Sequence, residues 1–173
     1  MRMQRRRILQ SILACAAGAA ALRPRAASPA PKGHTVNLPA AQDLHADGAI
    51  SARDGVPVLL FFDRGDCPYC ERALREFLVP MATGDAWRGR AIYRQVEIDQ
   101  TEPLVDFAGA MTTHRAFAQR HRIELTPTIY LVDSTGAALG KPLVGLMTPD
   151  FYGAYLEDAI ASAAARLRAT AKG

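Results

Sequence analysis

The chain of 173 residues is long enough for one domain, and its hydrophobic content of 49% argues against disorder along the whole length. The formal net charge of +4 arises at the N-terminus, because six arginines and no acidic residue occur within residues 1–27. The rest of the chain has 15 basic and 17 acidic residues, which gives no reason to expect a nucleic-acid-binding surface.

Residues 1–27 have the order of a signal peptide: a basic stretch, then an Ala-rich apolar run at Ile8–Leu22, then small residues. The apolar run is shorter than the about 20 residues that cross a bilayer. We therefore expect cleavage and a periplasmic protein. Gln4–Leu9 also resembles a twin-arginine signal, which leaves that export route open. An uncleaved anchor, or lipidation at Cys15, are the alternatives.

Residues 28–33 are rich in Pro and Ala and are interpreted as a linker, and residues 34–173 as one domain. The domain is expected to open with a short edge strand at His34–Leu38. A helix is predicted over Ala40–Arg53, although Gly48 is unfavourable there.

A continuous apolar run, Val56–Phe62, predicts a strand buried on both faces. After a polar loop at 63–66, a helix is expected from Cys67 to about Met81. Pro68 suits its first turn, and Pro80 should kink or end it.

The remaining elements are predicted from alternation, turn residues and helix caps: a strand at 91–98, a loop at 100–112, a helix at 113–121, a strand at 128–132, a turn at 133–136, a strand at 139–144 and a helix at 148–168. The order predicts an α/β fold with a central mixed sheet of four to five strands flanked by helices. Strands joined through helices are expected to be parallel, and the last two strands antiparallel.

The chemistry is concentrated at Cys67 and Cys70, which follow a buried strand and open a helix. Free N–H groups and the dipole at a helix N-terminus stabilise a thiolate on Cys67, and Cys70 is one turn further in, within reach of a mixed disulfide. Half a zinc site is the other interpretation. His114 and His121 lack ligand spacing and fit ordinary polar helix positions, so we expect redox chemistry without metal or organic cofactor.

A second motif, Thr126-Pro127-Thr128, precedes a predicted strand. Together with Cys67-Pro68-Tyr69-Cys70 it resembles the thioredoxin superfamily, over about residues 54–168. The resemblance implies a thioredoxin fold in which a cis Pro127 faces the cysteines. It also implies that Thr126, Pro127 and Tyr69 contact a bound peptide.

More narrowly, the chain resembles the periplasmic thioredoxin-related proteins of bacterial sulfur-oxidation systems. The residues that carry this likeness are Cys-Pro-Tyr-Cys-Glu, an inserted loop at Asp106-Phe107, and Gly145-Leu146 ahead of the last helix. For the proposed redox chemistry we expect clients with disulfides or thiols and a membrane electron donor, and we expect a monomer.

Two features depart from thioredoxins. The dipeptide between the cysteines is Pro-Tyr, as in glutaredoxins, and Phe61 replaces the buried acid that thioredoxins carry six residues before the first cysteine. The acceptor of the Cys70 proton must then lie elsewhere. Glu97 is a candidate, although an exposed strand position explains it as well. Trp87 and Phe107 either line a peptide groove or serve packing.

We therefore expect an exported thiol–disulfide oxidoreductase in which Cys67 forms a mixed disulfide and Cys70 resolves it. A mainly reducing role towards a small set of exported clients is expected. The alternatives are a non-catalytic peptide-binding module, and a disulfide oxidant or isomerase.

Overall fold

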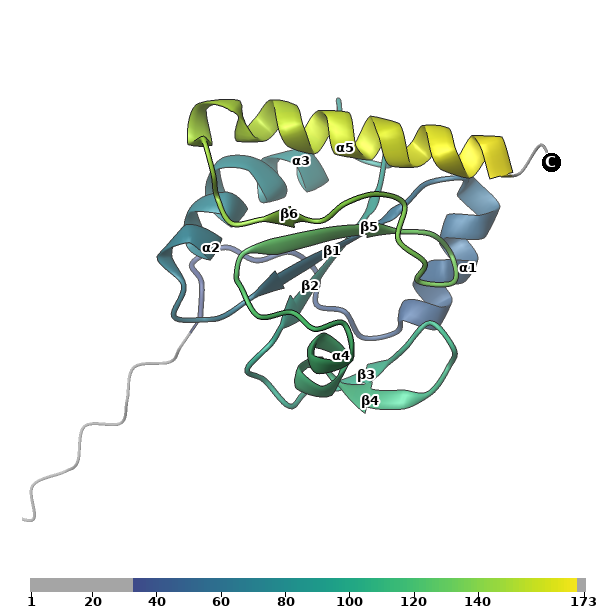
Figure 1. Ribbon diagram of the computed structural model, residues 1–173, viewed down its shortest axis with the longest axis horizontal. Helices are drawn as coiled ribbons and strands as arrows, with labels where there is room; N and C mark the ends of the chain where they lie inside the picture. Colours follow the sequence, from purple (N-terminus) through teal and green to yellow (C-terminus); the bar gives the residue numbers. More distant parts are fainter. Residues whose placement is uncertain (1–32, 171–173) are drawn as a thin grey trace, which may run out of the picture. The chain divides into compact units, whose positions relative to one another are not determined.

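The computed structural model describes residues 33–170, so the predicted signal peptide and most of the predicted linker lie outside the described residues. A four-stranded sheet in the order β2-β1-β5-β6 forms the centre (Figure 1). Its strands are β1 (Val58–Asp63), β2 (Ile92–Glu97), β5 (Thr128–Val132) and β6 (Leu143–Val144). The predicted α/β class with a mixed sheet is confirmed.

Strand β2 runs parallel to β1, as predicted, whereas β5 runs antiparallel to β1 and corrects the expectation of a parallel strand. The reason lies in the connection over residues 98–127. It starts at Ile98, whose N–H donates to Asp63 O at 2.9 Å, and it ends where Thr128 pairs with Phe62. The connection thus begins and ends at the same edge of the sheet. Strand β5 therefore has to run in the direction opposite to β1.

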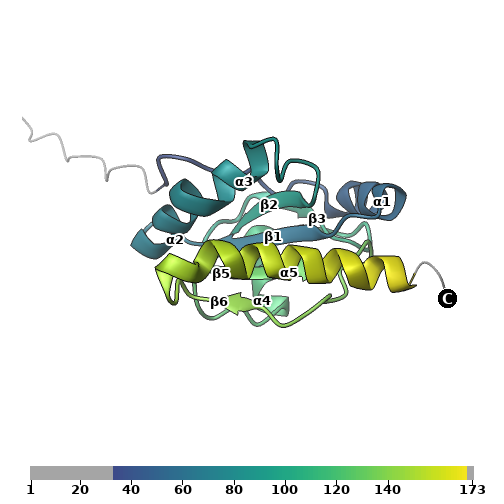
Figure 2. The same ribbon diagram turned by 90° about the horizontal axis from the view of Figure 1, so that it is seen from above.

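Within residues 33–170, six helical segments surround the sheet: α1 (Leu44–Asp54), α2 (Pro68–Ala73), the π-helical η1 (Leu74–Leu78), α3 (Val79–Thr83), α4 (His114–Arg120) and α5 (Pro149–Thr170). Figure 2 shows α5 running alongside the α2–α3 rod, where the rings of Phe77 and Tyr152 meet at 5.2 Å between centroids. No helix within residues 33–170 has the length and apolar character to span a membrane.

Alternation along β1 divides the core into two clusters. Leu59 and Phe61 pack with Cys70 against α2, η1 and α5, whereas Leu60 and Phe62 pack on the opposite face against α1 and α4. All six side chains of β1 are buried, as expected for a central strand covered on both faces. The two faces therefore differ in function, since only one carries the cysteines.

The helix that opens at the cysteines continues through Pro80 to Thr83, where the sequence predicted a kink or an end near Pro80. Pro80 has no N–H to donate to the carbonyl of Glu76, and its ring would crowd that carbonyl in a regular α-helix. The wider π turn at Leu74–Leu78 lies directly before it and accommodates the ring.

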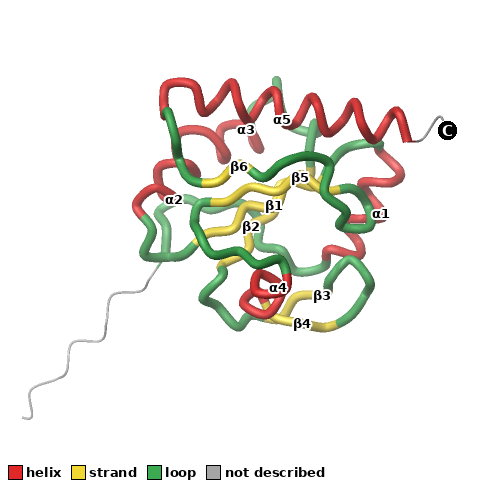
Figure 3. The backbone as a smooth tube through the Cα atoms, in the orientation of Figure 1, coloured by secondary structure: helices red, strands yellow, loops and turns green. Residues whose placement is uncertain are grey.

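Three smaller elements differ from the prediction. His34–Leu38 is no strand: backbone pairing with Gln95 is confined to Pro39–Ala41, and Leu38 N–H donates to the Gln95 side chain instead. The predicted loop at 100–112 contains a hairpin of β3 (Pro103–Val105) and β4 (Met111–Thr113), apart from the main sheet (Figure 3). The predicted strand at 139–144 shortens to β6, because Pro142 cannot donate to a ladder.

Candidate redox site

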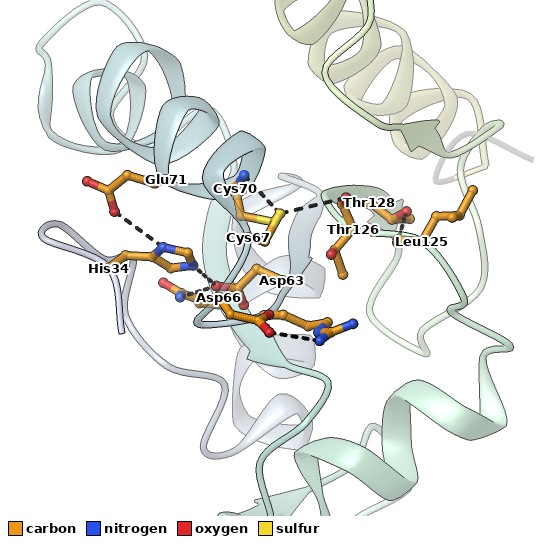
Figure 4. Close-up of a disulfide and its surroundings, with 11 residues drawn as sticks. His34, Asp63, Asp66, Cys67, Cys70, Glu71, Leu125, Thr126 and Thr128 are labelled. Carbon is orange, nitrogen blue, oxygen red and sulfur yellow. Dashed lines mark hydrogen bonds and ion pairs between the residues drawn. A yellow bond between two sulfur atoms is a disulfide. The ribbon is translucent and has the colours of Figure 1, made fainter. Parts of the chain in front are cut away.

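Cys67 and Cys70 form a disulfide at the start of α2, with their Cα atoms 5.2 Å apart (Figure 4). Cys67 is the residue that caps α2, and its Sγ accepts the N–H of Cys70 at 3.1 Å. Pro68 occupies the first turn, where a missing N–H costs nothing. Cys67 is half-buried and Cys70 fully buried, so an incoming sulfur atom reaches Cys67 first.

The arginines near the cysteines are paired with carboxylates. Arg64 Nη2 lies 3.0 Å from Asp66 Oδ2, and Arg72 Nε lies 2.9 Å from Glu76 Oε2. The two positive charges that could favour a Cys67 thiolate are therefore offset by their own partners. What remains to stabilise the thiolate is the N-terminus of α2 with its aligned N–H groups.

The Thr126–Pro127 peptide bond is cis, as predicted. Thr126 O lies 3.8 Å from Cys67 Sγ, which places this backbone carbonyl directly against the disulfide. Pro127 is buried, and its carbonyl accepts the N–H of Gly145 at 2.7 Å. The loop is thus held by the chain beyond β6 while it faces the cysteines.

Of the aromatic candidates, only Tyr69 lies at the site. Its side chain is 64% exposed between the two cysteines, and Leu125, before Thr126, is equally exposed. Trp87 packs beneath Arg90, whose Cζ lies 4.6 Å from the ring centroid. Phe107 packs against Gly136, where an added Cβ would lie 2.6 Å from its ring. Trp87 and Phe107 therefore serve packing.

The structure adds a buried carboxyl group that sequence analysis had assigned to a polar loop. Asp63 is the last residue of β1, and its side chain is completely buried. Its Oδ2 accepts the Gln95 Nε2–H at 2.8 Å and lies 2.9 Å from His34 Nε2. The sequence already indicated this burial, because side chains alternate along a strand and Asp63 lies on the same face as Leu59 and Phe61.

Burial raises the pKa of the Asp63 carboxyl group to about 8, and the negative charge of Glu97 acts in the same direction. The hydrogen bond from Gln95 opposes this rise in the pKa. Glu97, proposed from sequence as a proton acceptor, is half-buried and pairs in register with Asp63. Asp63 is thus a buried acid on the same face of β1 as Phe61, two residues further along the strand.

His114 is not the ordinary polar helix residue that the sequence suggested. It is buried, its Nδ1 accepts the N–H of Glu97 at 3.0 Å, and its Nε2 lies 2.9 Å from Ala41 O. A neutral imidazole satisfies both contacts when the proton is on Nε2. His121 packs on the ring of Phe117, and burial lowers its pKa. Both histidines therefore contribute to packing around α4.

Three solved structures with a related backbone are a thioredoxin-fold protein from Helicobacter pylori, a poplar thioredoxin h and the oxidised C-terminal domain of Neisseria meningitidis DsbD. Their identities to this chain are 18%, 15% and 19%, with TM-scores of 0.43, 0.46 and 0.43. The alignments cover 73%, 68% and 69% of this chain and 98%, 94% and 98% of theirs. Among curated proteins, none matches the chain.

The model of the thioredoxin-like domain family matches residues 46–160, which is more than half of the chain. The matched segment contains both cysteines and the cis proline. Together with the disulfide, this match supports thiol–disulfide oxidoreductase chemistry in general. The chain belongs to the thioredoxin-like domain family.

Proposed function

We propose that this protein is an exported thiol–disulfide oxidoreductase that reduces disulfides of exported client proteins. The observation that carries the proposal is the inequality of the two cysteines. Cys67 is half-buried at the start of α2, where its Sγ accepts the N–H of Cys70 and lies beside Thr126 O. Cys70 is fully buried behind it. This arrangement suits an attacking thiol and a resolving thiol.

In the reduced protein, the Cys67 thiolate attacks one sulfur of a client disulfide. A mixed disulfide forms, and the other client sulfur leaves as a thiolate. Cys70 then attacks Cys67 Sγ, so that the Cys67–Cys70 disulfide forms and the second client sulfur is released. The client gains two electrons that the protein loses, so an electron donor must reduce Cys67 and Cys70 again. We place this donor at the membrane.

The exposed side chain of Tyr69 and the backbone of Thr126 and Pro127 are proposed to hold the client segment beside Cys67. The 3.8 Å separation of Cys67 Sγ and Thr126 O supports this, because a chain bound there lies against a carbonyl able to accept an N–H. The resemblance to proteins of sulfur-oxidation systems suggests one client class, an exported carrier with a reactive thiol.

Trapping tests the proposed reaction. In the native compartment, a Cys70→Ala variant should accumulate mixed disulfides that a reductant dissolves, because attack by Cys67 remains and resolution is lost. The variant in which Cys67→Ser is combined with Cys70→Ala should trap none. Absence of mixed disulfides from the Cys70→Ala variant, at wild-type expression, would contradict a redox function and favour a peptide-binding module.

Export is tested by sequencing the N-terminus of the cellular protein. The mature chain should begin between residues 22 and 32, since the basic and apolar segments that form the predicted signal lie before them. A protein that still begins at Met1 would remove the argument for the periplasm.

A further inference from the structure

We propose that a pocket at the end of the sheet opposite to the cysteines binds a small aromatic anion, an aromatic carboxylate or sulfonate. The pocket has a volume of about 520 Å³ and lies between the C-terminal half of α5, the end of α1 and the turn before β2. Figures 1 and 2 both show the C-terminal half of α5 at the same end of the molecule as α1. This binding is independent of the proposed redox function, because it involves neither cysteine.

The position of the pocket separates it from the redox site. Val56, which lines the pocket, precedes β1, whereas Cys67 follows the end of the same strand. Because a strand rises about 3.3 Å per residue, the length of β1 places roughly 20 Å between the two sites. A ligand in the pocket therefore leaves Cys67 accessible to a client disulfide.

The size of the pocket matches that of sites for small organic molecules, which range from about 300 to 1,000 Å³. Ala161 and Ala164 line it from α5, and they lie on one face of the helix because they are three residues apart. Their short side chains leave the space open, and the buried Ile160 adds an apolar wall. A larger side chain at either alanine would occupy the volume that a ligand needs.

Trp87 gives the pocket an aromatic wall. Its side chain is half-buried, packs against the core cluster that contains Cys70, and also lines the pocket. Arg90 Cζ lies 4.6 Å from the centroid of the indole ring, so the guanidinium group lies over the ring. Aromatic rings stack on indole and on guanidinium planes. The wall therefore favours a ligand with an aromatic body over an aliphatic one.

Two arginines on the pocket carry positive charge that no carboxylate offsets. Arg90 and Arg168 both line it, and no salt bridge within residues 33–170 includes either of them. Asp54 is the carboxylate that lines the pocket, and its two oxygens accept from Arg53 Nε at 2.6 Å and Nη2 at 2.9 Å. The charge of Asp54 is thus offset by Arg53, which leaves Arg90 and Arg168 to attract an anion.

The helix dipoles at the pocket act against an anion. The C-terminal end of α1 reaches the pocket at Gly55, and Arg168 lies in the last turn of α5. The attraction therefore has to come from the two arginine side chains. A guanidinium group binds a carboxylate through two parallel N–H groups. Loss of either arginine should thus weaken an anion much more than a neutral molecule of the same shape.

The fluorescence of Trp87 reports directly on the pocket, because Trp87 is the single tryptophan of the chain. The purified oxidised protein is titrated with anilinonaphthalene sulfonate while the emission of Trp87 is followed. We expect saturable quenching with a Kd of roughly 10–100 μM, as the size of this probe allows. Phenylnaphthylamine has the same rings without the sulfonate and should bind at least about tenfold more weakly.

Arginine variants test the charge. Arg168→Gln and Arg90→Gln should each weaken binding of the sulfonate by roughly five- to tenfold and change binding of phenylnaphthylamine by less than about twofold. Arg168→Gln is the cleaner of the two, because it leaves the contact between Arg90 and Trp87 in place. Arg166→Gln is the matched control and should bind as wild type, since Arg166 is exposed on α5 outside this pocket.

Alanine variants test the space. Ala161→Leu should weaken binding of the sulfonate by at least about tenfold, because the added side chain fills part of the pocket. Ala161 is exposed, so leucine there extends into the pocket without entering the core. The half-buried Ala164→Leu should have the same effect in protein whose circular dichroism matches wild type. Ala165→Leu, exposed on α5 outside the pocket, is the control and should bind as wild type.

Competition extends the test to carboxylates: naphthoate should displace the sulfonate probe, and naphthamide at the same concentration should not. Equal displacement by both, or equal affinity for the sulfonate and phenylnaphthylamine, would overturn the inference. Wild-type binding by Arg168→Gln, or by both alanine variants, would overturn it as well, because the probe would then lie elsewhere, for example at the exposed side chains of Tyr69 and Leu125. The same holds if the wild-type protein shows no saturable quenching.

Discussion

The two sulfur atoms of the redox site have different surroundings although they are one helical turn apart. Cys67 is half-buried and accepts the N–H of Cys70, whereas Cys70 is completely buried against the core. In the reduced protein at neutral pH, Cys67 should react with iodoacetamide roughly ten times faster than Cys70, because only the thiolate reacts and only Cys67 is accessible. Mass spectrometry of digests measures both rates, and equal rates would contradict the assignment.

The buried Asp63 predicts a pH dependence of stability. The pKa of its carboxyl group is raised to about 8 in the folded protein. The folded state therefore binds the proton more tightly than the unfolded state, and stability is lost as pH rises. Between about pH 4 and pH 8 this group should lower the free energy of unfolding by up to about 1.4 kcal/mol for each pH unit.

Urea unfolding of the oxidised protein across this pH range tests the expectation. Asp63→Asn should flatten the dependence, because the amide keeps an acceptor for Gln95 but cannot ionise. Asp66→Asn, which changes an exposed acid nearby, is the matched control and should leave the slope unchanged. An unchanged slope in Asp63→Asn would show that another group is responsible.

Single residues were predictable from sequence where the chemistry is local. A few consecutive residues suffice to recognise the spacing of Cys67 and Cys70 and the position of Pro127 before a strand. The burial of Asp63 was not, since it depends on His34 and Gln95, which lie 29 and 32 residues away. A charged residue at the end of an apolar run is assigned to a loop as long as its hydrogen-bond partners in the fold are unknown.

At the scale of elements, α1 contains a glycine whose replacement by alanine should lower the stability of the protein, opposite to the usual effect in a helix. Alanine in place of glycine normally stabilises a helix interior by about 1 kcal/mol. At Gly48, however, an added Cβ would meet the backbone carbonyl oxygen of Ser134 and lie 3.5 Å from Phe107 Cδ1. Gly48→Ala should therefore destabilise the protein by about 1–3 kcal/mol, through a forced shift of the backbone.

Chemical denaturation measures this change against a control in the same helix. Ala52→Gly on the exposed side of α1 should cost about 1 kcal/mol through helix propensity alone. A Gly48→Ala protein that is more stable than wild type would show that α1 does not pack against the turn after β5.

Elements with several consistent signals were predicted well. The last helix was expected at 148–168 and lies at Pro149–Thr170, because Pro149 and Asp150 mark its start. Thr128–Val132 has the predicted bounds. The β3–β4 hairpin was missed because three-residue strands give too little alternation, and its turn depends on the Asp106 carboxylate accepting two backbone N–H groups.

At the scale of the whole molecule, the direction of β5 determines the redox site. A parallel β5, as the sequence suggested, would begin at the opposite edge of the sheet from the end of β1. The observed antiparallel strand begins where β1 ends, with Thr128 paired to Phe62. Thr126 and Pro127 therefore meet Cys67 at that edge. The motifs were recognisable in the sequence, but the reason for their proximity lies in the topology.

The last prediction concerns the reduction potential of the Cys67–Cys70 pair, which depends on the charges around the site. Strong disulfide oxidants have stabilised reduced forms, and additional positive charge beside the thiolate is one way to achieve this. Here Arg64 and Arg72 are paired with carboxylates, which leaves the N-terminus of α2 as the main stabilising feature. We expect a potential near that of glutaredoxins, roughly −200 to −230 mV, measured by equilibration with glutathione buffers. Asp66→Asn should release Arg64 and make the protein more oxidising, since the freed charge favours the Cys67 thiolate. A wild-type potential above roughly −150 mV would make the protein an oxidant and reverse the proposed direction of electron flow.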